Sequence, residues 1–156
     1  MYYRCVLALA AILLLTPPAF AAGKNALVGT WNLVSATGVP QGEPYGPHPL
    51  GQVIFTPDGH FSQILLSSEL PKFRGGNRTT GTPDENAAVV KGSIANIGTY
   101  RLTGNTLHLP IVGSTFPNYS RTDQTRPVHL MGERFSWKNL TASGGGVTTL
   151  VWQRAK

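Results

Sequence analysis

The sequence predicts an all-β protein, an eight-stranded antiparallel up-and-down barrel with one short helix. Three observations lead to this prediction. Apolar and polar residues alternate in eight short segments, as in strands that bury one face. Gly, Pro, Asn and Asp recur between these segments in short turn sequences. A single stretch combines a helix start signal with a stop signal. Strands joined mostly by hairpins close naturally into a barrel, because closure removes both sheet edges.

The predicted strands are separated by residues that favour turns. Thr56-Pro57-Asp58-Gly59, Gly104-Asn105 and Gly132-Glu133 are typical turn sequences, and a glycine-rich stretch precedes the last strand. The eight segments are Val28–Ala36, Gln52–Phe55, His60–Leu66, Ser93–Leu102, Thr106–Val112, Thr125–Met131, Arg134–Leu140 and Val147–Arg154.

Alternation indicates which side chains point into the barrel. Leu107, Leu109 and Ile111 share one face of the fifth strand, while His108 lies on the other; Phe135 and Trp137 likewise share a face. In the sixth strand Arg126 falls on the same face as Val128 and Leu130. We therefore expect Arg126 to enter the barrel near its mouth.

The predicted helix lies between the third and fourth strands. Thr82 can cap it, Pro83 suits its first position, and Glu85 completes a Thr-x-x-Glu capping box. Gly92 is placed to end it. A helix this short is expected to serve as a lid or plug rather than as a core element.

The N-terminus has the layout of a secretory signal peptide. Arg4 is followed by an apolar run of 11 residues, Cys5–Leu15, and Ala19 and Ala21 fit a cleavage site. The run is too short for a membrane span, which needs roughly 20 apolar residues. We expect residues 1–21 to be removed and residues 22–156 to form one domain. The product would be exported, either periplasmic or secreted.

Charge and composition exclude several classes of protein. Removal of residues 1–21 leaves 12 basic against 7 acidic residues, a net charge of +5, and removes the only cysteine. The basic residues are scattered singly, which argues against nucleic-acid binding and leaves an anionic ligand as an alternative. No two histidines stand at the close spacing of metal ligands, so neither a metal site nor a cofactor is predicted.

Four segments together resemble the bacterial and fungal lipocalin-like domain family. The resemblance implies a calycin-type barrel and little about activity, because most of the family has none assigned. Members often carry histidines where this sequence has Leu109-Pro110, and a loop glycine where it has Arg121. The segments that carry the resemblance are Leu27-Val28-Gly29-Thr30-Trp31; Tyr45-Gly46-Pro47-His48-Pro49-Leu50-Gly51 leading into Phe55-Thr56-Pro57-Asp58-Gly59; Gly98-Thr99-Tyr100 followed by Gly113-Ser114-Thr115-Phe116-Pro117-Asn118 and Thr122-Asp123-Gln124-Thr125-Arg126; and Leu150-Val151-Trp152.

The resemblance also implies a structural pair. Gly29-x-Trp31 is similar to the lipocalin signature, in which the tryptophan plugs the closed end of the barrel beneath an arginine near the last strand. Arg154 is placed to be that arginine. We therefore assign Trp31 and Arg154 to the stability of the fold.

Candidate ligand contacts are Arg126, Tyr45, His48, Tyr100, Phe116 and Asn118. Arg126 offers planar donors to an anionic or carbonyl oxygen, and the alternative for it is an ion pair with Asp123. The aromatic candidates and Asn118 could line a mostly apolar pocket or belong to the core.

The leading hypothesis is an exported small-molecule-binding protein that holds an amphipathic or anionic ligand in the barrel. One alternative is an enzyme of cyclase or isomerase type that polarises a carbonyl, although the sequence contains no recognisable catalytic dyad, which favours binding. The other alternative is a structural or partner-binding protein of the cell envelope.

Overall fold

Antiparallel strands make up most of the protein. The computed structural model describes residues 26–40 and 42–156, so the signal peptide predicted over residues 1–21 lies outside the described residues. The elements are β1 (Gly29–Val39), β2 (Leu50–Phe55), β3 (His60–Leu66), α1 (Pro83–Gly92), β4 (Ser93–Thr99), β5 (Arg101–Thr103), β6 (Thr106–Ser114), a 3-10 helix (Pro117–Tyr119), β7 (Thr122–Met131), β8 (Arg134–Asn139) and β9 (Val147–Arg154).

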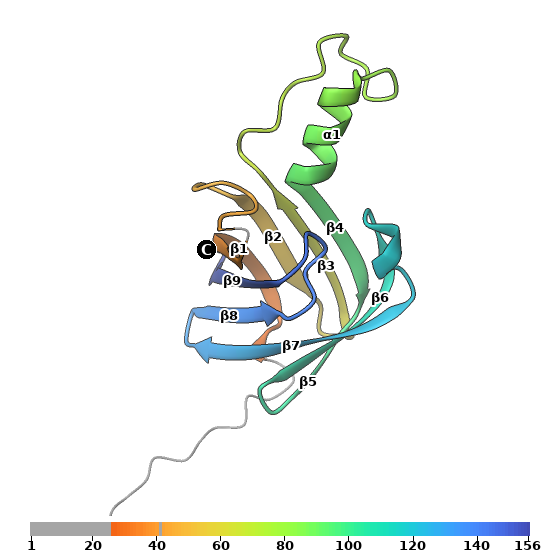
Figure 1. Ribbon diagram of the computed structural model, residues 1–156. Coiled ribbons are helices and arrows are strands. Elements are labelled where there is room, and N and C mark those ends of the chain that lie inside the picture. The colour runs from red at the N-terminus through yellow and green to blue at the C-terminus, as the bar shows by residue number, and fades with distance from the viewer. Residues whose placement is uncertain (1–25, 41) are drawn as a thin grey trace, which may run out of the picture.

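The strand segments form a closed eight-stranded barrel, and the short β5 is a ninth segment that pairs beside β6. Their order is β4-β3-β2-β1-β9-β8-β7-β6-β5, and β4 also pairs with β6, which closes the sheet (Figure 1). The predicted fold class is confirmed. The bounds of β3 and β9 agree with the prediction, and the other strand ends shift by at most three residues.

One strand that was predicted to be continuous is divided in the structure, so this prediction is wrong. The segment Ser93–Leu102 is divided at Tyr100 into β4, which pairs with β3 and β6, and β5, which pairs with β6. At the division the Tyr100 amide donates to the Gly59 carbonyl oxygen, 2.8 Å away. A Cβ at Gly98 would collide with the Pro110 carbonyl oxygen, so glycine is what lets β4 approach β6 this closely.

The two ends of the barrel differ. The closed end carries the β2–β3 and β7–β8 turns and the N-terminal approach to β1. Its interior is filled by aromatic rings that are at most 2% exposed: Trp31, Phe55, Phe135, Trp137 and Trp152. The open end carries the four longer connections, which are residues 40–49, 67–92, 115–121 and 140–146.

The predicted capping box of α1 is confirmed. The Thr82 hydroxyl accepts a hydrogen bond from the Glu85 amide, and the Glu85 carboxylate accepts one from the Thr82 amide. Figure 1 shows α1 standing above the end of β4 rather than between the strands, so it is not a plug. Its only buried residue is Gly92. No helix among the described residues has the length and apolar character needed to cross a membrane.

Candidate functional site

The connections at the open end surround a small cavity that reaches into the barrel. Its volume is about 60 Å³, against roughly 300–1,000 Å³ for sites that enclose drug-sized ligands. The cavity therefore accommodates a compact chemical group rather than a whole ligand of that size. The polar side chains that line it are Tyr45, Gln63, Asn96, Tyr119, Arg126, Asn139, Ser143 and Thr148.

Arg126 is the charged group of this cavity. It points into the barrel, as alternation predicts, and is 7% exposed. One guanidinium nitrogen donates to the Thr125 carbonyl oxygen at 2.8 Å and another to the Gln124 side-chain oxygen. Burial lowers the pKa of Arg126 to about 10, so the guanidinium stays charged at neutral pH. The two hydrogen-bond acceptors of Arg126 among the described residues are both neutral oxygens.

The alternative partner considered for Arg126, Asp123, is exposed on the outer face of β7. Residues three apart on a strand point to opposite faces, which is why the two side chains diverge. The ion pairs found in residues 26–40 and 42–156 are Asp58–His60 and Glu133–Arg154, and neither includes Arg126. The ion-pair alternative is therefore wrong.

Two buried amides on neighbouring strands also line the cavity. Gln63 on β3 and Asn96 on β4 are register partners and are each 7% exposed. The Asn96 amide nitrogen donates to the Gln63 oxygen at 3.5 Å. The Asn96 side-chain oxygen has no hydrogen-bond partner among the described residues. A buried acceptor left unpaired costs about 1–3 kcal/mol, so a donor that reaches this atom would stabilise the protein.

Two tyrosines complete the rim. The Tyr119 hydroxyl donates to the Thr141 carbonyl oxygen at 2.6 Å and accepts from the Asn139 amide at 3.4 Å. Burial, with a smaller contribution from Tyr119, raises the pKa of Tyr45 to about 12. Tyr45 is therefore protonated at neutral pH and can donate a hydrogen bond.

A wider groove continues from the cavity along the rim. Its volume is about 460 Å³, and its apolar lining includes Val89 and Val90 of α1 and Phe116. Ile94, Ser143 and Gly144 line both the cavity and the groove. The open end thus combines a small polar space with a larger, mainly apolar one.

The structure brings some of the predicted ligand contacts together and separates others. Arg126 and Tyr45 line the cavity, and Phe116 lines the groove. Tyr100 lies in the core, where its ring packs edge-on against Phe55 and its hydroxyl donates to the Thr56 carbonyl oxygen.

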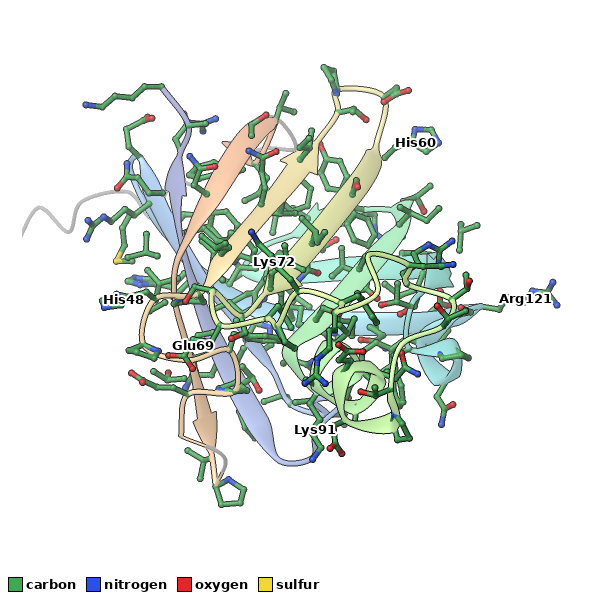
Figure 2. The ribbon with its side chains drawn as sticks, turned by 90° about the horizontal axis from the view of Figure 1, so that it is seen from above. His48, His60, Glu69, Lys72, Lys91 and Arg121 are labelled. Carbon is green, nitrogen blue, oxygen red and sulfur yellow. The ribbon has the colours of Figure 1, made fainter. Side chains whose placement is uncertain are left out.

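His48 and Asn118 are exposed and line neither space. Figure 2 shows His48 at the periphery of the molecule, directed away from the barrel. In the loop that carries it, Pro49 is the buried residue. This placement does not support a role for His48 as a ligand contact at the mouth of the barrel.

Alternation could have identified two lining residues that sequence reasoning missed. Gln63 shares a strand face with the buried Phe61 and Leu65, and Asn96 shares one with the buried Ile94. A polar residue on an otherwise apolar strand face is the signal that singled out Arg126, and it applies equally to these amides. Tyr119 has no such signal, because a loop places it.

At the closed end, Arg154 lies over the indole of Trp31, with its guanidinium carbon 4.0 Å from the ring centroid. Its nitrogens donate to the Val28 and Ala26 carbonyl oxygens and lie 3.0 Å from the Glu133 carboxylate. The Trp31 nitrogen donates to the Leu27 carbonyl oxygen at 2.7 Å. Gly29 has a φ of 124°, and a Cβ there would press on Arg154, so the glycine of this motif is sterically required.

A hollow of about 340 Å³ lies on the outer face where β4 gives way to β5, among exposed side chains that include Arg101, Asp123 and Thr125. Within residues 26–40 and 42–156, His, Cys, Asp and Glu side chains do not gather in groups of three or more.

Comparison with models of protein families gives a match over most of the chain. The model of a family described as "Lipocalin-like domain" matches residues 28–155, which is nearly all of the chain that the structure describes. No curated protein matches the sequence.

Proposed function

The chain belongs to the lipocalin-like domain family, and we propose that it is an exported protein that binds a small amphipathic ligand at the open end of its barrel. In this proposal a polar, anionic head occupies the cavity around Arg126 and an apolar tail lies in the rim groove. The observation that carries the proposal is the buried guanidinium of Arg126, whose protein partners are neutral oxygens.

An anionic head follows from the cost of burying a charge. A guanidinium in an apolar barrel needs partners for its five N–H groups and is most stable beside a counter-charge. In the described chain, Arg126 is bonded to one carbonyl and one amide oxygen. A carboxylate or similar anion fits the planar donors that remain.

An apolar tail follows from the two volumes. The cavity of about 60 Å³ admits only a head group, whereas the adjoining groove offers about 460 Å³ beside Val89, Val90 and Phe116. Burial of apolar tail surface there contributes roughly 25 cal/mol per Å². The shared lining of the two spaces allows one molecule to occupy both.

Binding is favoured over catalysis by the protonation of the lining groups. Tyr45, with a pKa of about 12, and Arg126, with a pKa of about 10, both keep their protons at neutral pH. Among the described residues that line the cavity there is no His, Asp, Glu or Lys. The cavity is thus equipped to hold a ligand through fixed donors and acceptors rather than to transfer a proton near neutrality.

Export rests on the N-terminal sequence pattern, which lies outside the described residues. The proposal places the mature N-terminus at Ala22. N-terminal sequencing of protein from its own host is the test. A product that keeps Met1 and sediments with membranes would contradict export while leaving the binding proposal intact.

Calorimetric titration of the purified protein with decanoate, decanol and decyltrimethylammonium tests the binding proposal. We expect decanoate to bind best. Arg126→Met should weaken decanoate binding by about tenfold or more, since a hydrogen bond to a charged group contributes about 1.5–3 kcal/mol. Thermal stability should stay similar or rise, because a buried charge is removed.

Arg121→Met is the matched control. Figure 2 shows Arg121 projecting away from the barrel, so this variant loses the same charge outside the cavity. Its affinity for decanoate should equal that of the unmodified protein. Equal binding of all three probes, or equal weakening by both variants, would overturn the anionic-head proposal.

A further inference from the structure

Asn96 places a second requirement on the head of the ligand. Its amide nitrogen is engaged with the Gln63 oxygen, and this bond leaves the Asn96 side-chain oxygen as the free end. The side chain is 7% exposed and lines the same cavity as Arg126. An O–H or N–H group of a molecule in the cavity can satisfy this enclosed acceptor if the Asn96 side chain turns its oxygen towards it.

Arg126 and Asn96 therefore require opposite chemistry from one occupant. Arg126 presents only donors, so it needs an acceptor, and a negatively charged one is best. The Asn96 oxygen is an acceptor, so it needs a donor. A simple carboxylate serves Arg126 but turns oxygen lone pairs towards Asn96, and an ammonium group serves Asn96 but is repelled by Arg126.

We infer that the ligand is an amphipathic acid with a neutral hydrogen-bond donor next to its carboxylate, the donor facing Asn96 and the carboxylate facing Arg126. Hydroxy acids and N-acyl amino acids share this chemistry. A cavity of about 60 Å³ holds only a few atoms, so the two groups should be close together in the head of the ligand. This inference rests on the proposed function, since it assumes that the head binds in the cavity and the tail in the groove.

The test compares acids with tails of similar length. Calorimetric titration of the full protein with decanoate, 2-hydroxydecanoate, 3-hydroxydecanoate and N-octanoylglycine measures the effect of the donor directly. At least one donor-bearing acid should bind about tenfold or more tighter than decanoate, because only it satisfies the buried acceptor. Which of the three binds best distinguishes a hydroxy acid from an N-acyl amino acid.

Asn96→Leu then assigns the effect to one atom. It removes the acceptor and keeps a side chain of similar size. The preference for the donor-bearing acid should fall to within about twofold, and decanoate should bind at least as well as before. Asn118→Leu is the matched control, because Asn118 is an exposed asparagine of the 3-10 helix. It should leave the preference unchanged, and melting curves establish that both variants fold.

The outcomes separate the inference from the proposed function. If decanoate and the donor-bearing acids bind equally and Arg126→Met weakens them all, the inference is wrong and the proposed function stands. If none of the four acids binds the unmodified protein, both are wrong. A preference that persists in Asn96→Leu would overturn the role of Asn96. The comparison within the unmodified protein does not depend on the folding of any variant.

Discussion

Each end of the barrel holds an inward-directed arginine, and the protein satisfies the two to different extents. At the closed end, Arg154 meets two backbone carbonyls, the Glu133 carboxylate and the face of Trp31. At the open end, Arg126 meets one carbonyl and one amide oxygen beside a cavity. The same residue type thus completes the fold at one end and, in the proposed function, holds the ligand at the other.

The surroundings of the two arginines differ in the same way. The closed end is packed with rings, such as Trp31 edge-on to Phe135 with centroids 4.7 Å apart. At the open end, the Asn96 side-chain oxygen has no hydrogen-bond partner among the described residues. Dense packing indicates a structural role at the closed end, although the Trp152 nitrogen there also lacks a hydrogen-bond partner among the described residues. An unpaired acceptor beside a cavity instead favours a ligand.

The largest effect is expected from Trp31→Ala at the closed end. Trp31 is fully buried, so its truncation leaves a cavity among the rings and should lower the free energy of unfolding by roughly 3–5 kcal/mol. Urea titration measures the loss. Whatever protein still folds should keep its preference among the ligand probes. A fully stable variant with an altered preference would place Trp31 in the binding site.

A smaller effect is expected from Arg154→Met, which leaves the Val28 and Ala26 carbonyl oxygens without their guanidinium donor. The free energy of unfolding should fall by about 1–3 kcal/mol, with ligand affinity unchanged. Arg126→Met should behave in the opposite way, losing affinity and keeping stability. The proposed contrast between the two ends is wrong if Arg154→Met and Arg126→Met both lower only the free energy of unfolding, or both lower only the ligand affinity.

The smallest effect is expected at α1 and depends on pH. Amide groups of Arg74 and Thr82 donate to the Glu85 carboxylate and hold its pKa below its usual value near 4.5. Because the pKa is lowered in the folded state, this stabilisation is present above pH 4.5 and is lost as the pH falls through the lowered value. The protection factors of the amides in residues 74–92, which correct for the intrinsic pH dependence of hydrogen exchange, should therefore fall at acidic pH.

Glu85→Gln is the control for this effect. An amide does not titrate, so the variant should show lower protection factors in residues 74–92 already at pH 6, with little further change at low pH. The barrel strands should exchange alike in both proteins at pH 6. An undiminished acid response of residues 74–92 in Glu85→Gln would assign the effect to another group.

Most of the fold could be predicted from the sequence, because local signals and burial agree in each element. The capping residues set the start of α1, and alternation set the strand faces. The division at Tyr100 could not be predicted, since inward residues continue at every second position from Ile94 through Gly98 to Leu102 across it. It depends on β4 approaching β6, a contact between distant parts of the chain.

The candidate site was less predictable because loops build part of it. Arg126 could be placed by strand alternation, which fixes the direction of a side chain. No such rule governs a loop, so His48 points outward and Tyr119 turns inward from the 3-10 helix. Arg121 has a φ of 61°, a conformation that glycine adopts most easily, at the position where the resemblance implies a glycine.

Barrel closure also bears on how copies of this protein meet one another. The pairing of β4 with β6 leaves β5, Arg101–Thr103, as the described strand that has a neighbour on one side only. Addition of a strand from a second molecule requires a row of free backbone N–H and C=O groups, and three residues provide very few. The exposed charge of Arg101 discourages such docking further. The fold therefore offers little template for edge-to-edge aggregation, even when the protein is concentrated.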